Sequence, residues 1–152
     1  MLSVTRDQLA HAISAAFVSP PPRPGDLIEP GADVSDAADI RRALRGRRWT
    51  AVPRRVPIDE RSGISWFTPA ALQHYLPLWL LASLDDEMVR FWTVTQLGFA
   101  AEKTAHQARF KGLSAAERQA ICLFLRWIAD THADERASAL KALTWWSDGS
   151  RA

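Results

Sequence analysis

The chain has 152 residues, of which 47% are apolar and 24% are charged, and its formal net charge is +2. These values exclude a disordered chain and suit one globular domain that buries roughly 68–70% of its unfolded surface. A charge of +2 is too small to indicate a nucleic-acid-binding protein.

The sequence gives little reason to expect export or a membrane location. The longest apolar run, residues 76–82, is far shorter than the roughly 20 residues that cross a bilayer. Arg6 and Asp7 come early, and no apolar signal-peptide core follows them. The single cysteine, Cys122, cannot form an internal disulfide. We therefore expect a cytoplasmic protein with no membrane partner.

The first predicted helix begins after Thr5. Thr5 and Gln8 have the spacing of a capping box, and the apolar residues Leu9, Ile13, Ala16 and Phe17 fall on one helical face. Prolines at positions 20, 21, 22 and 24 then prevent regular structure. Residues 19–34 are predicted to form an irregular, proline-rich connector.

A shorter helix is predicted over residues 35–45, with Ile40 and Leu44 inward and Gly46 as its stop. Residues 47–67 form an irregular segment rich in Arg and Trp. Within it, residues 49–52 and 64–67 have the composition of short strands, which predicts a two-stranded β element between residues 48 and 67. Pro53 and Pro57 would confine this element to an edge pairing.

From residue 68 onward the pattern is helical. Thr68 is a helix N-cap followed by Pro69, and the residues up to Leu84 are apolar on most sides, as in a central buried helix. Further helices are expected over residues 88–99 and 134–146. Another is expected to begin at the capping box Ser114–Glu117, with apolar residues up to Ile128 facing inward. The predicted fold is mainly α: residues 1–152 form one domain, a compact orthogonal bundle of about five to six helices.

No catalytic motif is present. The chain lacks a glycine-rich phosphate loop, a G-x-S-x-G elbow, an H-E-x-x-H pair and a C-x-x-C pair. Cys122 follows an apolar residue in an amphipathic helix, so we expect a small core residue. His74 and Tyr75 suit either an acid–base pair or core residues with satisfied polar tips, and the second is favoured. We predict no catalytic residue and no cofactor.

One weak constellation leaves a metal-binding enzyme as an alternative. Glu102 and His106 are four residues apart, and His132 and Glu135 are three apart, so each pair suits one helical face. Helical carboxylate proteins bind metals with such pairs, but they need Glu-x-x-His twice and two further glutamates. Surface ion pairing explains these residues more simply, so no metal site is predicted.

Eight arginines lie between residues 41 and 61, and an acidic block at residues 26, 29, 33, 36 and 39 precedes them. The two blocks either neutralise each other or leave a basic surface for a partner. Arginine binds carboxylates through a planar fork, and an exposed tryptophan is a frequent contact residue. The predicted partner-binding residues are Arg47, Arg48, Trp49, Arg54 and Arg55. We favour a partner protein with an acidic surface. The alternative is a nucleic-acid-associated protein that binds through Arg41–Arg61.

The run from Phe67 through Ala71 to Tyr75-Leu76-Pro77 resembles the F-x-x-x-A…Y-L-P helix signature of a small bacterial family of unknown function. An upstream Trp, here Trp49, and a later Leu-Ser helix cap, here Leu113-Ser114, extend the resemblance. This chain departs from the family at His74, where other members carry a second aromatic residue. The resemblance implies a compact helical fold and supplies no activity.

Taken together, the sequence predicts a non-enzymatic protein-binding protein. The specific form that we expect is a bacterial immunity protein that occludes a toxin with an acidic surface. This expectation depends on the absence of catalytic motifs and on the segment rich in Pro, Arg and Trp.

Overall fold

Helices dominate the computed structural model, which describes residues 3–31, 34–102 and 104–148, without the side chains of residues 34–36, 100–102, 105 and 106. The α-helices are α1 (Arg6–Ala16), α2 (Val34–Leu44), α3 (Val56–Asp59), α4 (Pro69–Ala82), α5 (Glu87–Glu102), α6 (Thr104–Arg109), α7 (Ala115–Thr131) and α8 (Arg136–Trp146). Three 3-10 turns add η1 (Trp49–Ala51), η2 (Arg61–Ser65) and η3 (Ala133–Glu135). The prediction of a mainly α protein is confirmed.

The predicted β element between residues 48 and 67 is wrong. Its two expected strands are the 3-10 turns η1 and η2, and α3 lies between them. Among the described residues the only β-type pairing is an isolated bridge between Ile28 and Phe67. Pro57 lies in the first turn of α3, where a helix needs no backbone N–H, so it marks a helix start and not a strand edge.

The helix count also exceeds the predicted five to six within the described residues. The two additional helices are α3, with four residues, and α6, with six residues. Helices of this length contain less than two turns, so they cannot display the repeating apolar positions from which a helix is predicted.

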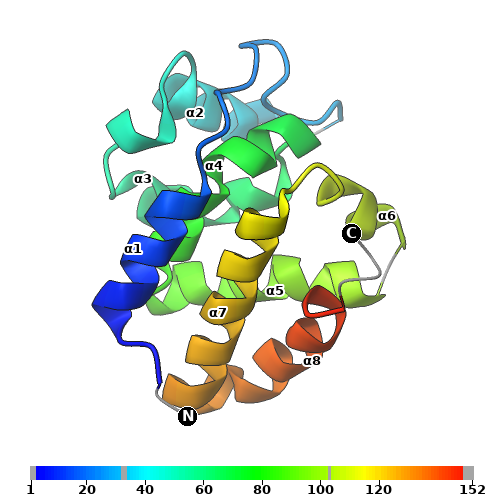
Figure 1. Ribbon diagram of the computed structural model, residues 1–152. Coiled ribbons are helices and arrows are strands. Elements are labelled where there is room, and N and C mark those ends of the chain that lie inside the picture. The colour runs from blue at the N-terminus through cyan, green and yellow to red at the C-terminus, as the bar shows by residue number, and fades with distance from the viewer. Residues whose placement is uncertain (1–2, 32–33, 103, 149–152) are drawn as a thin grey trace.

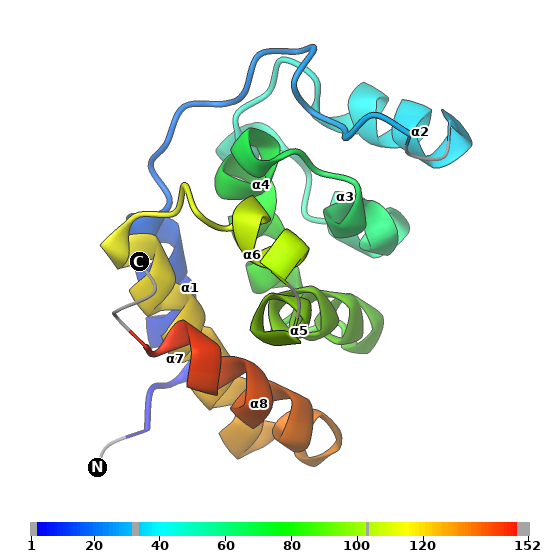
Figure 2. The ribbon, with the colours of Figure 1, turned by 90° about the vertical axis from the view of Figure 1, so that its right-hand side faces the viewer.

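Helix α4 occupies the centre of the molecule (Figure 1). Helices α1 and α7 lie side by side, α8 packs along α7, and α5 runs across the direction of α7. Figure 2 shows α2 and α3 at one end of α4, on the opposite side of the molecule from α7 and α8. The arginine-rich segment that connects α2 to α4 therefore lies apart from the α7–α8 pair.

The sequence of α4 accounts for its central place. Eleven of its 14 residues are buried, and the cap residue Thr68 accepts a hydrogen bond from the backbone N–H of Ala71. The Thr68 hydroxyl also donates to the carbonyl of Asp26 at 2.7 Å, which fixes the preceding connector to the helix start. Across the described residues, every helix falls short of the length and apolar character needed for a membrane crossing.

Candidate functional site

The structure separates the five predicted partner-binding residues. Arg47, Arg48, Arg54 and Arg55 are exposed. Trp49 is only 8% exposed, and its indole Nε1–H donates to the carbonyl of Phe17 at 3.0 Å. Its ring is therefore part of the core and is not available as a surface contact.

His74 of α4 fixes the backbone at Trp49. The imidazole is 3% exposed, and its Nε2 accepts a hydrogen bond from the backbone N–H of Trp49 at 2.9 Å. The other nitrogen, Nδ1, lies 2.8 Å from the carbonyl oxygen of Ser19, which can only accept. The ring is thus neutral, with its proton on Nδ1. Burial lowers the pKa of His74, and the nearby Arg48 lowers it further.

Tyr75 fixes the end of α2 in the same way. Its hydroxyl lies 3.0 Å from the carbonyl oxygen of Leu44 and 2.6 Å from that of Arg47, and its single proton is donated to these acceptors. The rings of His74 and Tyr75 meet edge to face at 4.7 Å. The buried His–Tyr pair therefore fixes residues 44–49 from beneath, and the prediction of core residues with satisfied polar tips is confirmed.

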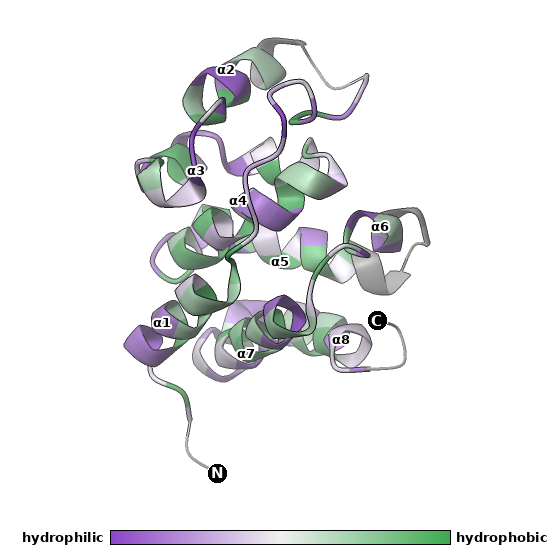
Figure 3. Ribbon diagram, turned by 45° about the horizontal axis from the view of Figure 1, so that its top comes forward, coloured by the Kyte–Doolittle hydropathy of each residue, from purple (hydrophilic) through white to green (hydrophobic). Residues whose placement is uncertain are grey.

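Above this pair lie four exposed arginines, which we call the arginine surface: Arg41, Arg45, Arg47 and Arg48. None of them forms an ion pair with a described side chain. Arg41 and Arg45 line a shallow hollow on α2. Hydrophilic residues mark this end of α2 and the segment that follows it in Figure 3.

Two other arginines of the segment have carboxylate partners, and Arg54 lines a separate hollow. Arg42 pairs with Asp39 at 3.3 Å, and Arg55 pairs with Asp59 at 3.1 Å. The Asp39–Arg42 pair is the only ion pair between the acidic and basic blocks among the described residues; Asp33 and the Asp36 side chain lie outside them. Neutralisation within the segment is therefore incomplete and leaves the arginine surface unpaired.

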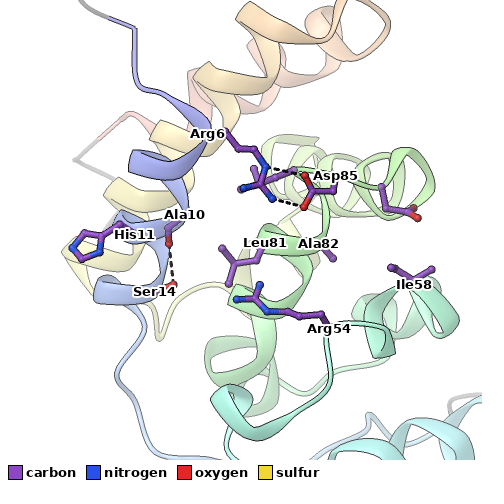
Figure 4. A pocket seen from close by; sticks show the side chains of 11 residues that line it. Arg6, Ala10, His11, Ser14, Arg54, Ile58, Leu81, Ala82 and Asp85 are labelled. Atoms are coloured by element: carbon purple, nitrogen blue, oxygen red, sulfur yellow. Dashed lines mark hydrogen bonds and ion pairs between the residues drawn. The ribbon is translucent and has the colours of Figure 1, made fainter.

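Arg54 belongs to a different place, a hollow of about 530 Å³ between α1, α3 and the end of α4 (Figure 4). There the guanidinium of Arg6 binds Asp85 through two hydrogen bonds, one of them 2.8 Å from Nε to Oδ1. The hydrogen bond from Arg6 lowers the pKa of Asp85, and the positive charges of Arg90 and Arg54 add to this effect. Since Arg54 lines this separate hollow and not the end of α2, we do not include Arg54 in the arginine surface.

The structure leaves the metal-binding alternative untested. The side chains of Glu102 and His106 lie outside the described residues. His132 ends α7, packs against the Trp127 ring at 5.2 Å, and has an Nε2 without a hydrogen-bond partner. Burial raises the pKa of Glu135. Among described side chains, His, Cys, Asp and Glu nowhere form a group of three suited to a metal ion.

Cys122 is half-buried and packs against the core. Burial raises the pKa of its thiol, although the positive charges of Arg118 and Arg126 oppose this effect. A thiol with a raised pKa is protonated at neutral pH and is a poor nucleophile. The expectation of a structural cysteine agrees with this environment.

Replacing Tyr75 with Phe tests whether the His–Tyr pair fixes the arginine surface. We expect the free energy of unfolding to fall by about 1–2 kcal/mol, because two carbonyl groups lose the hydroxyl while the ring stays. Hydrogen exchange should become faster at residues 44–49 and stay unchanged in α7. Uniform acceleration over the whole chain, or none at residues 44–49, would contradict the assigned role.

The protein is thus mainly helical, and its arginine surface includes a segment whose backbone is held by the buried His74 and Tyr75. By its match to the model of a family of unknown function, DUF6714, over residues 29–150, the chain belongs to that family. No curated protein and no solved structure matches the chain. The match includes α2 through α8 and therefore contains both the His–Tyr pair and the arginine surface.

Proposed function

We propose that this protein is a non-enzymatic protein-binding protein and that its arginine surface contacts an acidic surface of a partner. One observation carries the proposal: four exposed arginines form no ion pair with a described carboxylate, and the buried His74 and Tyr75 fix the backbone at residues 44–49. A surface that is ordered before binding loses less conformational entropy when the partner arrives.

Stabilisation of α2 accounts for only some of the charges on the arginine surface. Cations near the carbonyl end of a helix are stabilising, which accounts for Arg41 in the last turn of α2 and for Arg45 directly after it. Arg47 and Arg48 follow the helix and lie beyond this effect. Arginine forks bind carboxylates through paired hydrogen bonds, so an acidic protein surface complements these two residues best.

The chemistry of the surroundings favours a protein partner over nucleic acid. Asp39 and Asp59 flank the arginine surface in the sequence, and both take part in ion pairs at the protein surface. These carboxylates keep the basic field short, whereas a nucleic acid favours a wider basic field. Specifically, we propose that this protein is an immunity protein, which binds a toxin in the cytoplasm and keeps it inactive.

The test is a double charge reversal, Arg47→Glu with Arg48→Glu, in the full chain. We expect affinity for the partner that copurifies from the native host to fall at least about tenfold, because opposite charges become like charges. The thermal midpoint should stay close to that of the parent, since both side chains are exposed. Affinity is measured by titration of the purified pair.

Two control variants test whether the loss of affinity is specific to Arg47 and Arg48. Arg23→Glu with Arg126→Glu produces the same change in net charge at exposed positions elsewhere and should keep the affinity. Arg54→Glu with Arg55→Glu should have the smaller effect, because Arg55 is already paired with Asp59 and Arg54 lines a separate hollow. Equal losses in all three variants, or the absence of any associated protein, would contradict the proposal; a nuclease-sensitive partner would instead indicate nucleic acid.

A further inference from the structure

A second feature lies away from the arginine surface, where α6, α7 and α8 meet. A hollow of about 220 Å³ is lined by four side chains: Gln107 of α6, Lys111 after it, Arg118 of α7 and Trp145 of α8. Each of these side chains carries N–H donors, two are cationic, and no carboxylate lines the hollow.

Arg118 is a buried cation that forms no ion pair within the described part of the chain. It is 8% exposed, and its guanidinium carbon lies 5.1 Å from the Trp145 ring centre and 5.0 Å from that of Trp146. Its Nη2 has no hydrogen-bond partner, and no described carboxylate forms an ion pair with Arg118. The faces of the two tryptophan rings stabilise the guanidinium by less than its burial costs. A counter-ion would normally offset the rest of this desolvation cost.

Trp145 adds a second donor without an acceptor. The residue is 6% exposed, and its Nε1–H makes no hydrogen bond. By contrast, the indole N–H groups of Trp49, Trp79 and Trp146 each donate to a backbone carbonyl at 3.0–3.1 Å. The Trp66 N–H is unpaired as well, but Trp66 does not line the hollow. A buried donor without an acceptor is costly, so an acceptor supplied at the hollow would stabilise Trp145.

We infer that this hollow binds a small oxyanion, a phosphate or carboxylate group, between Arg118, Lys111 and Trp145. An oxyanion supplies acceptors for the Arg118 fork and for the Trp145 N–H, and its charge offsets both cations. Gln107 offers a further amide donor at the same hollow. This site goes beyond the proposed protein-binding function and shares no residue with the arginine surface.

The inference is tested with the full chain, inorganic phosphate and acetate, against chloride at equal ionic strength. We expect phosphate, acetate or both to raise the thermal midpoint and to change tryptophan fluorescence saturably. Phosphate alone identifies a phosphoryl site, and acetate alone identifies a carboxylate site. No response beyond that to chloride overturns the inference.

Variants identify the residues that bind the ion. Lys111→Gln removes an exposed charge, and Trp145→Phe keeps an aromatic ring but loses the N–H, so both should fold; each should weaken binding several-fold. Arg118→Gln should weaken it roughly tenfold or more. The matched control is Arg126→Gln, an exposed arginine on the same helix α7 outside the hollow, which should bind like the parent. Equal affinity in Lys111→Gln, Trp145→Phe and the control overturns the inference even if Arg118→Gln fails to fold.

Discussion

Replacing Trp79 with alanine is expected to lower the free energy of unfolding by about 3–5 kcal/mol. The side chain is fully buried, meets the Phe67 ring edge to face at 5.2 Å, and donates from Nε1 to the carbonyl of Arg61 at 3.1 Å. Truncation removes these contacts, leaves a cavity and deprives a carbonyl in η2 of its donor. The loss is measured by chemical denaturation with the parent protein as reference.

The matched control for this prediction is Trp92→Ala. Trp92 is the same residue type, but it is half-buried and packs at the edge of the core. Its truncation should therefore cost clearly less than that of Trp79. Similar losses for the two variants would show that Trp79 does not have the central role that its burial indicates.

Replacing His74 with leucine is expected to lower the free energy of unfolding by about 2–5 kcal/mol, because two buried backbone groups lose their partners at once. The Trp49 N–H loses its acceptor, and the Ser19 carbonyl loses its donor. Leucine is similar in size, so the loss reports mainly the hydrogen bonds. A change below about 1 kcal/mol would mean that these backbone groups find other partners.

His74 also predicts how stability depends on pH. Its folded-state pKa lies below that of the unfolded chain, near 6.5, so the unfolded state takes up the proton first as the pH falls. Stability should therefore be lost below about pH 6.5 and down to the folded pKa, at up to about 1.4 kcal/mol per pH unit.

This pH dependence is measured by denaturation of the parent and the His74→Leu variant at several values between about pH 5 and pH 7.5. The variant should have a flatter profile. Burial also lowers the pKa of His132, which contributes in the same direction, so His132→Gln serves as the comparison. Identical profiles for the parent and His74→Leu would contradict the assignment of a neutral His74 in the folded state.

Local signals account for what could be predicted from the sequence. The capping boxes Thr5–Gln8 and Ser114–Glu117 involve residues three apart, and both are present with the expected hydrogen bonds. The start of α4 at Thr68 and Pro69 is equally local, and its all-round apolar character correctly indicated a central helix. Such features depend on neighbours within one turn, so the sequence contains the whole signal.

The candidate surface could be predicted only in part, because its remaining determinants are distant in the chain. Trp49 is buried by a contact to His74, 25 residues away, and nothing in the sequence near Trp49 indicates this. Arg54 lines the same hollow as Asp85, which lies in the turn between α4 and α5, about 30 residues further along the chain. The density of arginines indicated a candidate segment, but only tertiary packing decides which of its arginines have a carboxylate partner among the described residues.

The position of α4 in the chain has a consequence for the order of events during synthesis. The side chains that fix residues 17–67 come from Thr68, His74, Tyr75 and Trp79, all of which are translated later than the segments they hold. Their hydrogen bonds cannot form while α4 is still inside the ribosome. The backbone beneath the arginine surface is therefore fixed only after the supporting helix has emerged.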